Sequence, residues 1–136
     1  MKCFSILAVI LSTTAATTVS YDTGYDDASR SMNMVACSDG TNGLETKRGW
    51  MTQGAVAGFP YIGGSNDISA WNSPSCGQCY AITYNGKTIH MLAIDHDDEG
   101  INMSEAAMND LTGGQAVHSG RVDAEVIKID GGAFGF

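Results

Sequence analysis

Basic residues are scarce in this chain of 136 residues. Seven Lys and Arg stand against 15 Asp and Glu, which gives a formal net charge of −8. Proteins that bind nucleic acid present a basic patch, and anionic membrane surfaces repel a strongly acidic protein. The composition therefore argues against nucleic acid and membranes as partners and favours a neutral or cationic ligand.

Long apolar runs are also lacking after the first 16 residues, so no later segment reaches the ~20 apolar residues of a transmembrane helix. The first 16 residues combine the basic Lys2, the apolar run Phe4–Leu11 and the small residues Thr14-Ala15-Ala16. This order is typical of a cleaved secretory signal peptide. We therefore expect residues 1–16 to be a signal peptide and residues 17–136 to form a single domain of a secreted protein.

Cysteines are few, and their number is odd once the signal peptide and its Cys3 are removed. Cys37, Cys76 and Cys79 remain, which in an oxidising compartment predicts one disulfide and one unpaired thiol. A zinc site would need a second pair of ligands at similar spacing, and the sequence has none. A thioredoxin-like site would need a helix at Cys76, whereas residues 80–84 alternate as a strand does. No cofactor is expected.

The clearest structural signal is the pair Asn85-Gly86 between two β-prone runs, residues 80–84 and 88–94. Both residues tolerate a positive φ, which a type I′ turn requires, so the pair predicts a β-hairpin. The second strand leads into an acidic loop at residues 95–99. The hairpin therefore places candidate polar chemistry at the end of a well-defined strand.

Helix signals are sparse, and the 17 glycines are spread over long connections. Ser104 as N-cap and Gly113 as the left-handed stop predict one helix over residues 104–112. Methionines near this helix are expected in the core. Short strands, one or two short helices and long Gly-rich loops predict a closed β architecture. The other expected segments are an edge strand at 18–21, a helical turn within 25–30, strands at 32–37 and 121–130, and a long ordered connection without helical periodicity at 49–67.

Several motifs in order along the chain resemble the cerato-platanins, small secreted proteins of filamentous fungi. The motifs are Ala36-Cys37-Ser38-Asp39-Gly40, the run from Gly58-Phe59-Pro60 to Cys76-Gly77-Gln78-Cys79, and Gly120-Arg121-Val122-Asp123. The resemblance implies a six-stranded double-ψ β-barrel, related in fold to the first domain of expansins and to barwin. It also implies an extracellular or wall-associated protein that binds chitin or N-acetylglucosamine oligomers, with cellulose as a further candidate, loosens polysaccharides without hydrolysis, and elicits plant defences through a plant surface receptor.

The same resemblance assigns the cysteines. It pairs Cys37 with Cys76 and leaves Cys79 unpaired, because the family's second disulfide has its other half near the C-terminus. There the sequence reads Asp130-Gly131-Gly132 and has no cysteine. The protein is therefore expected to be a monomer, or a dimer through Cys79.

Asp95 is the leading candidate for a ligand-binding residue. It ends an apolar strand, which fixes its backbone, and it matches the groove aspartate of the cerato-platanins and expansins. Gly100 lets a ligand approach the backbone, and Asn102 offers both a donor and an acceptor. The expected carbohydrate-binding residues are therefore Asp95, Gly100, Ile101 and Asn102, with Ile101 in place of an aromatic residue of the family.

Two alternatives start from the same acidic loop. Glycoside hydrolysis takes two carboxylates ~5–9.5 Å apart, and the obvious partners of Asp95 all lie in its own loop, so a weak glycoside hydrolase or lytic transglycosylase ranks second. Residues 95–100 also copy half of an EF-hand calcium loop, but the closing position holds Ala106 in place of Glu. The preferred reading is binding without catalysis or metal.

Histidines and aromatic residues give weaker signals. The three histidines are scattered and form no i, i+4 pair, so they are expected at the surface or hydrogen-bonded within the fold. Core packing is expected for Trp71, which lies in the Gly-rich stretch before the cysteines. The aromatic residues considered for stacking on sugar rings are Trp50, Trp71, Tyr21 and Tyr61.

Overall fold

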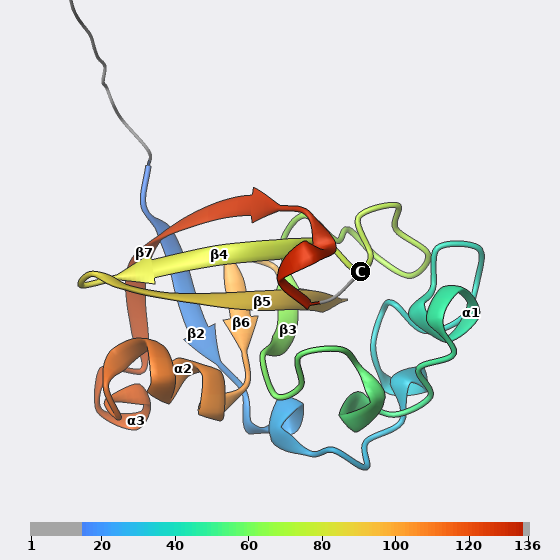
Figure 1. The fold of residues 1–136 in the computed structure, drawn as a ribbon, viewed down its shortest axis with the longest axis horizontal. Helices are drawn as coiled ribbons and strands as arrows, with labels where there is room; N and C mark the ends of the chain where they lie inside the picture. Colours follow the sequence, from blue (N-terminus) through green and yellow to red (C-terminus); the bar gives the residue numbers. More distant parts are fainter. Residues whose placement is uncertain (1–14, 135–136) are drawn as a thin grey trace, which may run out of the picture.

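A computed structural model describes residues 15–134 as a closed barrel of six strands (Figure 1). Around the barrel the strands follow the order β2-β6-β3-β5-β4-β7. Two pairs, β2 with β6 and β3 with β5, are parallel, and the others are antiparallel. The strands are β2 (Thr17–Tyr21), β3 (Ile62–Ser65), β4 (Cys79–Tyr84), β5 (Lys87–His96), β6 (Ile101–Met103) and β7 (Arg121–Ile129). The expected double-ψ barrel class is confirmed, whereas most of the predicted signal peptide lies outside the described residues.

The predicted hairpin is confirmed as β4 and β5. Asn85 and Gly86 both have positive φ, 48° and 80°, as a type I′ turn requires. The antiparallel register runs without interruption from Tyr84 opposite Lys87 to Cys79 opposite Leu92. The turn therefore fixes which residues of β5 face the core, and it sets where the strand ends at its acidic loop.

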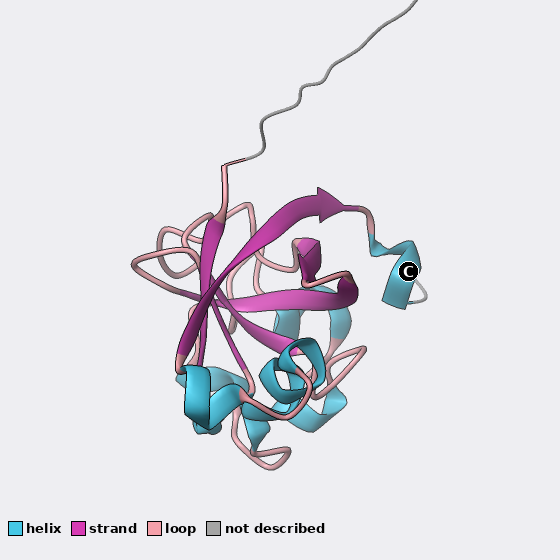
Figure 2. Cartoon of the chain, turned by 90° about the vertical axis from the view of Figure 1, so that its left-hand side faces the viewer, coloured by secondary structure: helices cyan, strands magenta, loops and turns pink. Residues whose placement is uncertain are grey.

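The helices are short and lie outside the strands (Figure 2). The predicted helix is confirmed as α2 (Glu105–Thr112): the Ser104 hydroxyl accepts from the backbone N–H of Ala107, and Gly113 ends the helix in the left-handed conformation. None of the helices in the described part of the chain has the length and apolarity needed to cross a membrane. The others are α1 (Leu44–Arg48), α3 (Ala116–Ser119) and four 3₁₀ turns, η1 (Thr23–Asp26), η2 (Met32–Met34), η3 (Gln53–Ala55) and η4 (Gly131–Phe134).

The core fills the barrel and continues beneath α2. The alternation of β6 is typical: Ile101 and Met103 are buried and the residue between them is not. Burial of such side chains stabilises the fold by roughly 1.5–3 kcal/mol each. The methionines near α2 belong to this core, as predicted. Fully buried side chains include Val19, Ile62, Ile82, Met91, Leu92, Ile94, Met103 and Met108.

Several sequence expectations are wrong. Residues 18–21 are not an edge strand, because β2 pairs with both β6 and β7 and the closed barrel has no edge. Residues 32–37 form the 3₁₀ turn η2 and bends rather than a strand. The strand expected at residues 121–130 is present as β7; its Ile127 is exposed, and its pairing partner changes from β2 to β4 after Ala124.

The long connection expected at residues 49–67 contains strand β3, which the sequence analysis did not predict. Gly63 and Gly64 gave no strand signal because glycine has a low β propensity. They are needed because neighbouring strands approach closely: a Cβ on Gly63 would lie 2.2 Å from the Asn102 carbonyl oxygen. The one bulge in the β3–β5 pairing falls between these two glycines and sets the register that follows.

Candidate functional site

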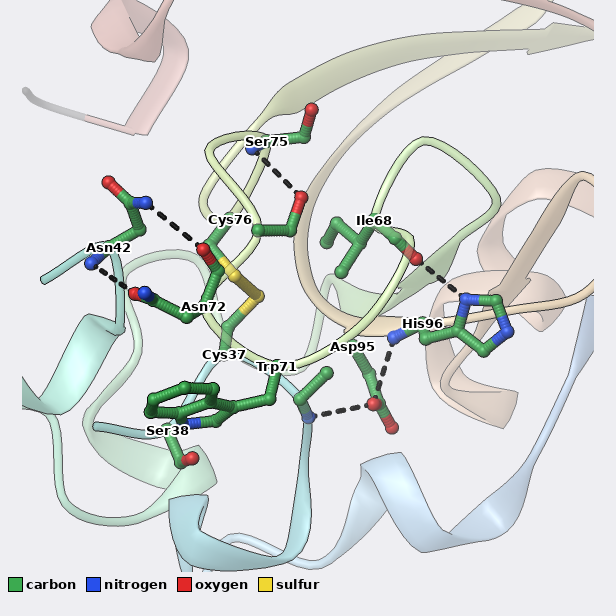
Figure 3. Close-up of a disulfide and its surroundings, with 12 residues drawn as sticks. Cys37, Ser38, Asn42, Ile68, Trp71, Asn72, Ser75, Cys76, Asp95 and His96 are labelled. Atoms are coloured by element: carbon green, nitrogen blue, oxygen red, sulfur yellow. Dashed lines mark hydrogen bonds between the residues drawn. A yellow bond between two sulfur atoms is a disulfide. The ribbon is translucent and has the colours of Figure 1, made fainter. Parts of the chain in front are cut away.

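A disulfide joins the segment before α1 to the loop before β4 (Figure 3). Cys37 and Cys76 are bonded with 5.5 Å between their Cα atoms and a sequence separation of 39, which confirms the predicted pairing. Cys79 is free and 2% exposed. Burial, and to a lesser degree the nearby Asp130, raises the pKa of its thiol. The disulfide therefore links two irregular segments to each other, and Cys79 is a buried thiol at the start of β4.

Asp95 lies near the end of β5, and its carboxylate accepts three hydrogen bonds from the protein. Oδ1 accepts from the backbone N–H of Ala36 and of His96, both at 2.9 Å. Oδ2 accepts from the hydroxyl of Tyr25, also at 2.9 Å. Tyr25 is 5% exposed, and burial together with the adjacent carboxylate raises the pKa of its hydroxyl. Asp95 thus ties the segment before the disulfide and the η1 turn to the barrel, and is no solvated strand end.

The sheet register places Asp95 in a row of polar residues that crosses four strands. Gly64 on β3 pairs with Asp95 on one side and with Asn102 on the other. Asn102 in turn pairs with Ser20 on β2, whose hydroxyl donates to Asn102 Oδ1 at 3.1 Å. We call Ser20, Asn102, Gly64 and Asp95 the polar row. It brings together two of the four predicted binding residues, Asp95 and Asn102, whose side chains are both half-buried.

The other two predicted residues take different positions. Gly100 is buried with φ +69°, and a Cβ there would lie 2.2 Å from the Thr18 carbonyl oxygen, so the glycine serves close packing of the backbone against β2. The side chain of Ile101 is 2% exposed and lies in the core. Only the backbone of Ile101 can therefore contribute to a ligand site. Gly100 also borders an open hollow lined by Thr17, Thr18, Asn66, Glu99 and Asp123.

The acidic loop after β5 is held by His96. The ring nitrogen Nδ1 lies 2.6 Å from the Ile68 carbonyl oxygen, and Nε2 lies 2.8 Å from Asp98 Oδ1. The bond to the Ile68 carbonyl, followed by the bond to Asp98, raises the pKa of the imidazole. Within the described residues no group of three or more His, Cys, Asp or Glu is arranged to hold a metal ion.

Trp71 is not in the core, contrary to the sequence expectation. Its side chain is 58% exposed, on the loop between β3 and β4. The indole N–H donates to Asp39 Oδ1 at 2.7 Å. A Cβ on Gly40 would lie 2.9 Å from the ring, which therefore packs against the Gly40 backbone. The apolar residue type of Trp71 suggested an interior position. Its exposure depends on Asp39, a partner that is distant in the sequence and that the sequence analysis did not identify.

Two more tyrosine–aspartate pairs resemble Tyr25–Asp95 and had no sequence signal, because their members are far apart in the chain. Tyr80 donates to Asp67 at 2.6 Å, and burial is the main reason why the pKa of Tyr80 is raised. Tyr61 donates to Asp110 at 2.7 Å, and Lys87 lies 2.8 Å from the same carboxylate and contributes most to lowering its pKa. These pairs offer matched controls for Asp95.

Comparison with known proteins agrees with the barrel fold. The family model described as Cerato-platanin matches residues 17–136. The chain belongs to the cerato-platanin family. Allergen Asp f 15 of Aspergillus fumigatus is 51% identical over 112 residues, which are 82% of this chain and 72% of that protein. Cerato-platanin of Ceratocystis fimbriata f. sp. platani is 43% identical over 129 residues, which are 93% of this chain and 92% of that protein.

Solved cerato-platanin structures share the fold. The crystal structure of cerato-platanin 1 from M. perniciosa superposes with a TM-score of 0.81 at 47% identity, covering 85% of this chain and 96% of that one. The solution structure of the fungal elicitor Cerato-Platanin gives 0.76 at 40% identity, covering 83% of this chain and 92% of that one. The barrel of this cerato-platanin family member is therefore the family's barrel.

Proposed function

We propose that this cerato-platanin family member is a secreted protein that binds chitin-type oligosaccharides through the polar row and loosens polysaccharides without hydrolysing them. The observation that carries the proposal is the register that places Asn102 and Asp95 on either side of Gly64. Gly64 itself is buried, so a ligand would contact the half-buried side chains of Asn102 and Asp95 that flank it. Carboxylate, amide and hydroxyl groups in one row suit the hydroxyls and N-acetyl groups of such a sugar.

The overall charge supports a neutral ligand. A protein with a net charge of −8 repels polyanions, whereas its charge does not affect the approach of an uncharged oligosaccharide. Within the polar row, the Ser20 hydroxyl donates a hydrogen bond to Asn102 Oδ1. The Asn102 amide therefore presents its N–H donors to a sugar, while the Asp95 carboxylate presents an acceptor.

Binding without hydrolysis fits the surroundings of Asp95. A general acid carries a proton on the carboxyl, but both Asp95 oxygens accept hydrogen bonds from Ala36, His96 and Tyr25. A carboxylate has about four acceptor positions, so three internal donors leave about one for a ligand. This arrangement suits a fixed acceptor, and a weak glycoside hydrolase or lytic transglycosylase remains the second candidate.

The proposed setting is extracellular or wall-associated, with the protein acting as a monomer. The buried thiol of Cys79 supports the monomer over a disulfide-linked dimer. A role in eliciting plant defences, through a plant surface receptor, belongs to the same proposal, and it is supported by one solved relative that is named a fungal elicitor. Cellulose is the second polysaccharide to test beside chitin.

One assay separates binding from hydrolysis. The protein is incubated with chitin, cellulose and N-acetylglucosamine oligomers, and both bound protein and new reducing ends are measured. We expect binding and dispersal of chitin with no reducing sugar above the blank. Sustained release of soluble products that stops in Asp95→Asn would favour the hydrolase instead. Failure to bind any of the three would reject the proposed function.

A further inference from the structure

Trp71 presents most of a large apolar ring to solvent at a fixed position. At 58% exposure it is among the most exposed large apolar side chains in the described part of the chain. Indole rings at protein surfaces are enriched at binding sites, because they offer a broad apolar face together with a polar N–H. Figure 3 shows the ring beside Ser38, next to the disulfide.

Several contacts hold the ring in place. The indole N–H is bonded to Asp39, and the ring packs on Gly40. The next residue, Asn72, takes a positive φ of 63° and accepts from the backbone N–H of Asn42, while the Asn42 side chain donates to the Asn72 carbonyl. The two loops are also linked by the disulfide, two residues before Asp39. The ring is therefore fixed before any ligand arrives, which lowers the entropic cost of binding.

The surroundings of the ring suit one kind of occupant. Because Gly40 lies behind the ring, the exposed part of the indole is an apolar surface with the acidic Asp39 at its rim. A pyranose ring has an apolar face of C–H groups and a rim of hydroxyls. Its face can cover the indole while a hydroxyl donates to the Asp39 carboxylate. The local negative charge and the net charge of −8 disfavour an anionic partner.

We infer that Trp71 is a stacking subsite for a sugar ring of a neutral oligosaccharide, with Asp39 as its hydroxyl acceptor. The inference takes its ligand class from the proposed function but uses no residue of the polar row. The two sites are near each other. Ala36 contacts Asp95, and Asp39 contacts Trp71. Because Asp39 follows Ala36 by three residues, the Cα atoms of Ala36 and Asp39 lie within about 11 Å of each other. A longer oligomer can therefore reach both sites at once.

The test uses calorimetric titration with a chitin hexamer and three variants of the full domain. Trp71→Ala should weaken binding roughly three- to tenfold, because an aromatic contact contributes about 0.5–1.5 kcal/mol beyond its area. Trp71→Phe should keep most of the affinity. Val117→Ala, which shortens another exposed apolar residue on α3, should bind as the wild type does. Circular dichroism confirms that each variant is folded.

Fluorescence gives a second readout, since the chain has two tryptophans. The hexamer should change the emission of the wild type, and the change should disappear in Trp71→Phe, where only Trp50 remains. If Asp95→Asn weakens binding and Trp71→Ala does not, the inference is wrong and the proposed function stands. The reverse result supports the subsite and moves binding away from the polar row. Absence of any hexamer binding would overturn the subsite. Self-association of the protein that Trp71→Ala abolishes would also overturn it, because Trp71 would then be a contact between two copies of the chain.

Discussion

The backbone N–H of Ala36 donates a hydrogen bond of 2.9 Å to the Asp95 carboxylate. Ala36 precedes Cys37 of the disulfide, and the backbone N–H of Cys37 donates to the Ile94 carbonyl. The same carboxylate also receives the Tyr25 hydroxyl from η1. The residue proposed to bind sugar is therefore also a structural anchor, and variants of Asp95 need to separate these two roles.

Stability should distinguish Asp95→Ala from Asp95→Asn. Alanine leaves the Ala36 N–H and the Tyr25 hydroxyl without a partner, which should lower the free energy of unfolding by about 2–3 kcal/mol. Asparagine keeps an acceptor for Ala36 and offers its NH₂ to the Tyr25 oxygen, so it should cost about 1 kcal/mol or less. Urea denaturation measures both. Equal losses for the two variants would mean that the charge, rather than hydrogen-bonding shape, holds the segment.

Affinity should respond to the charge of Asp95. Because Asp95→Asn keeps the shape, the loss of a charged acceptor, about 1.5–3 kcal/mol, should weaken chitin-oligomer binding roughly ten- to a hundredfold. Asp67→Asn is the matched control, since Asp67 also accepts from a buried tyrosine hydroxyl, that of Tyr80, and lies outside the polar row. If both variants lose affinity equally, the effect is a general consequence of lost charge.

The disulfide should be a major source of stability. Its cysteines are 39 residues apart, and closing such a loop contributes about 4 kcal/mol in the chain-entropy model. The double variant Cys37→Ala with Cys76→Ala should lose about that much in urea denaturation. Cys79→Ala, which removes a buried thiol but no crosslink, is the control and should lose much less. Peptide mapping that finds Cys79 in a disulfide would contradict the assignment.

How far the sequence predicts this molecule depends on whether the signal is local. The hairpin at Asn85-Gly86 and the helix capped by Ser104 depend on neighbouring residues, and both were predicted correctly. Strand β3 was missed, because its glycines are required by the close approach of β6, which is distant in the sequence. Asp95 was found as the end of a strand, but its bond to Ala36, 59 residues away, is a product of the folded barrel.

The same reasoning explains the aromatic residues. Trp71 was assigned to the core from its residue type and its place before the cysteines. It is exposed instead, and Asp39 and Gly40, some 30 positions earlier, give it a polar partner and a backbone to pack on. Ile101 was placed in a groove by position within a motif, and strand alternation sends its side chain into the core. Tertiary partners decide such positions, and a single sequence does not show them.

The thiol of Cys79 should react slowly in the folded protein. Burial raises its pKa, so less thiolate is present at pH 8 than for an ordinary cysteine near 8.5, and the side chain is 2% exposed. Iodoacetamide labelling followed by mass spectrometry should show at least a tenfold slower rate in buffer than in urea. A native rate equal to that of a short peptide would contradict the burial, and would reopen dimerisation through this residue.

Lowering the pH through neutrality should tighten the loop that carries Trp71. Two acceptors, the Ile68 carbonyl and Asp98, raise the folded-state pKa of His96 above the unfolded value near 6.5. Its stabilisation is therefore fully present below about pH 6.5 and is lost as the pH rises through the higher folded pKa. NMR titration of the His96 ring should show that raised value. The protection factors of the amides at residues 66–72, which correct for the intrinsic slowing of exchange in acid, should rise as the pH falls in the wild type and in His118→Gln, an exposed-histidine control. They should not rise in His96→Gln; a rise in that variant equal to the wild type's would assign the effect to another group.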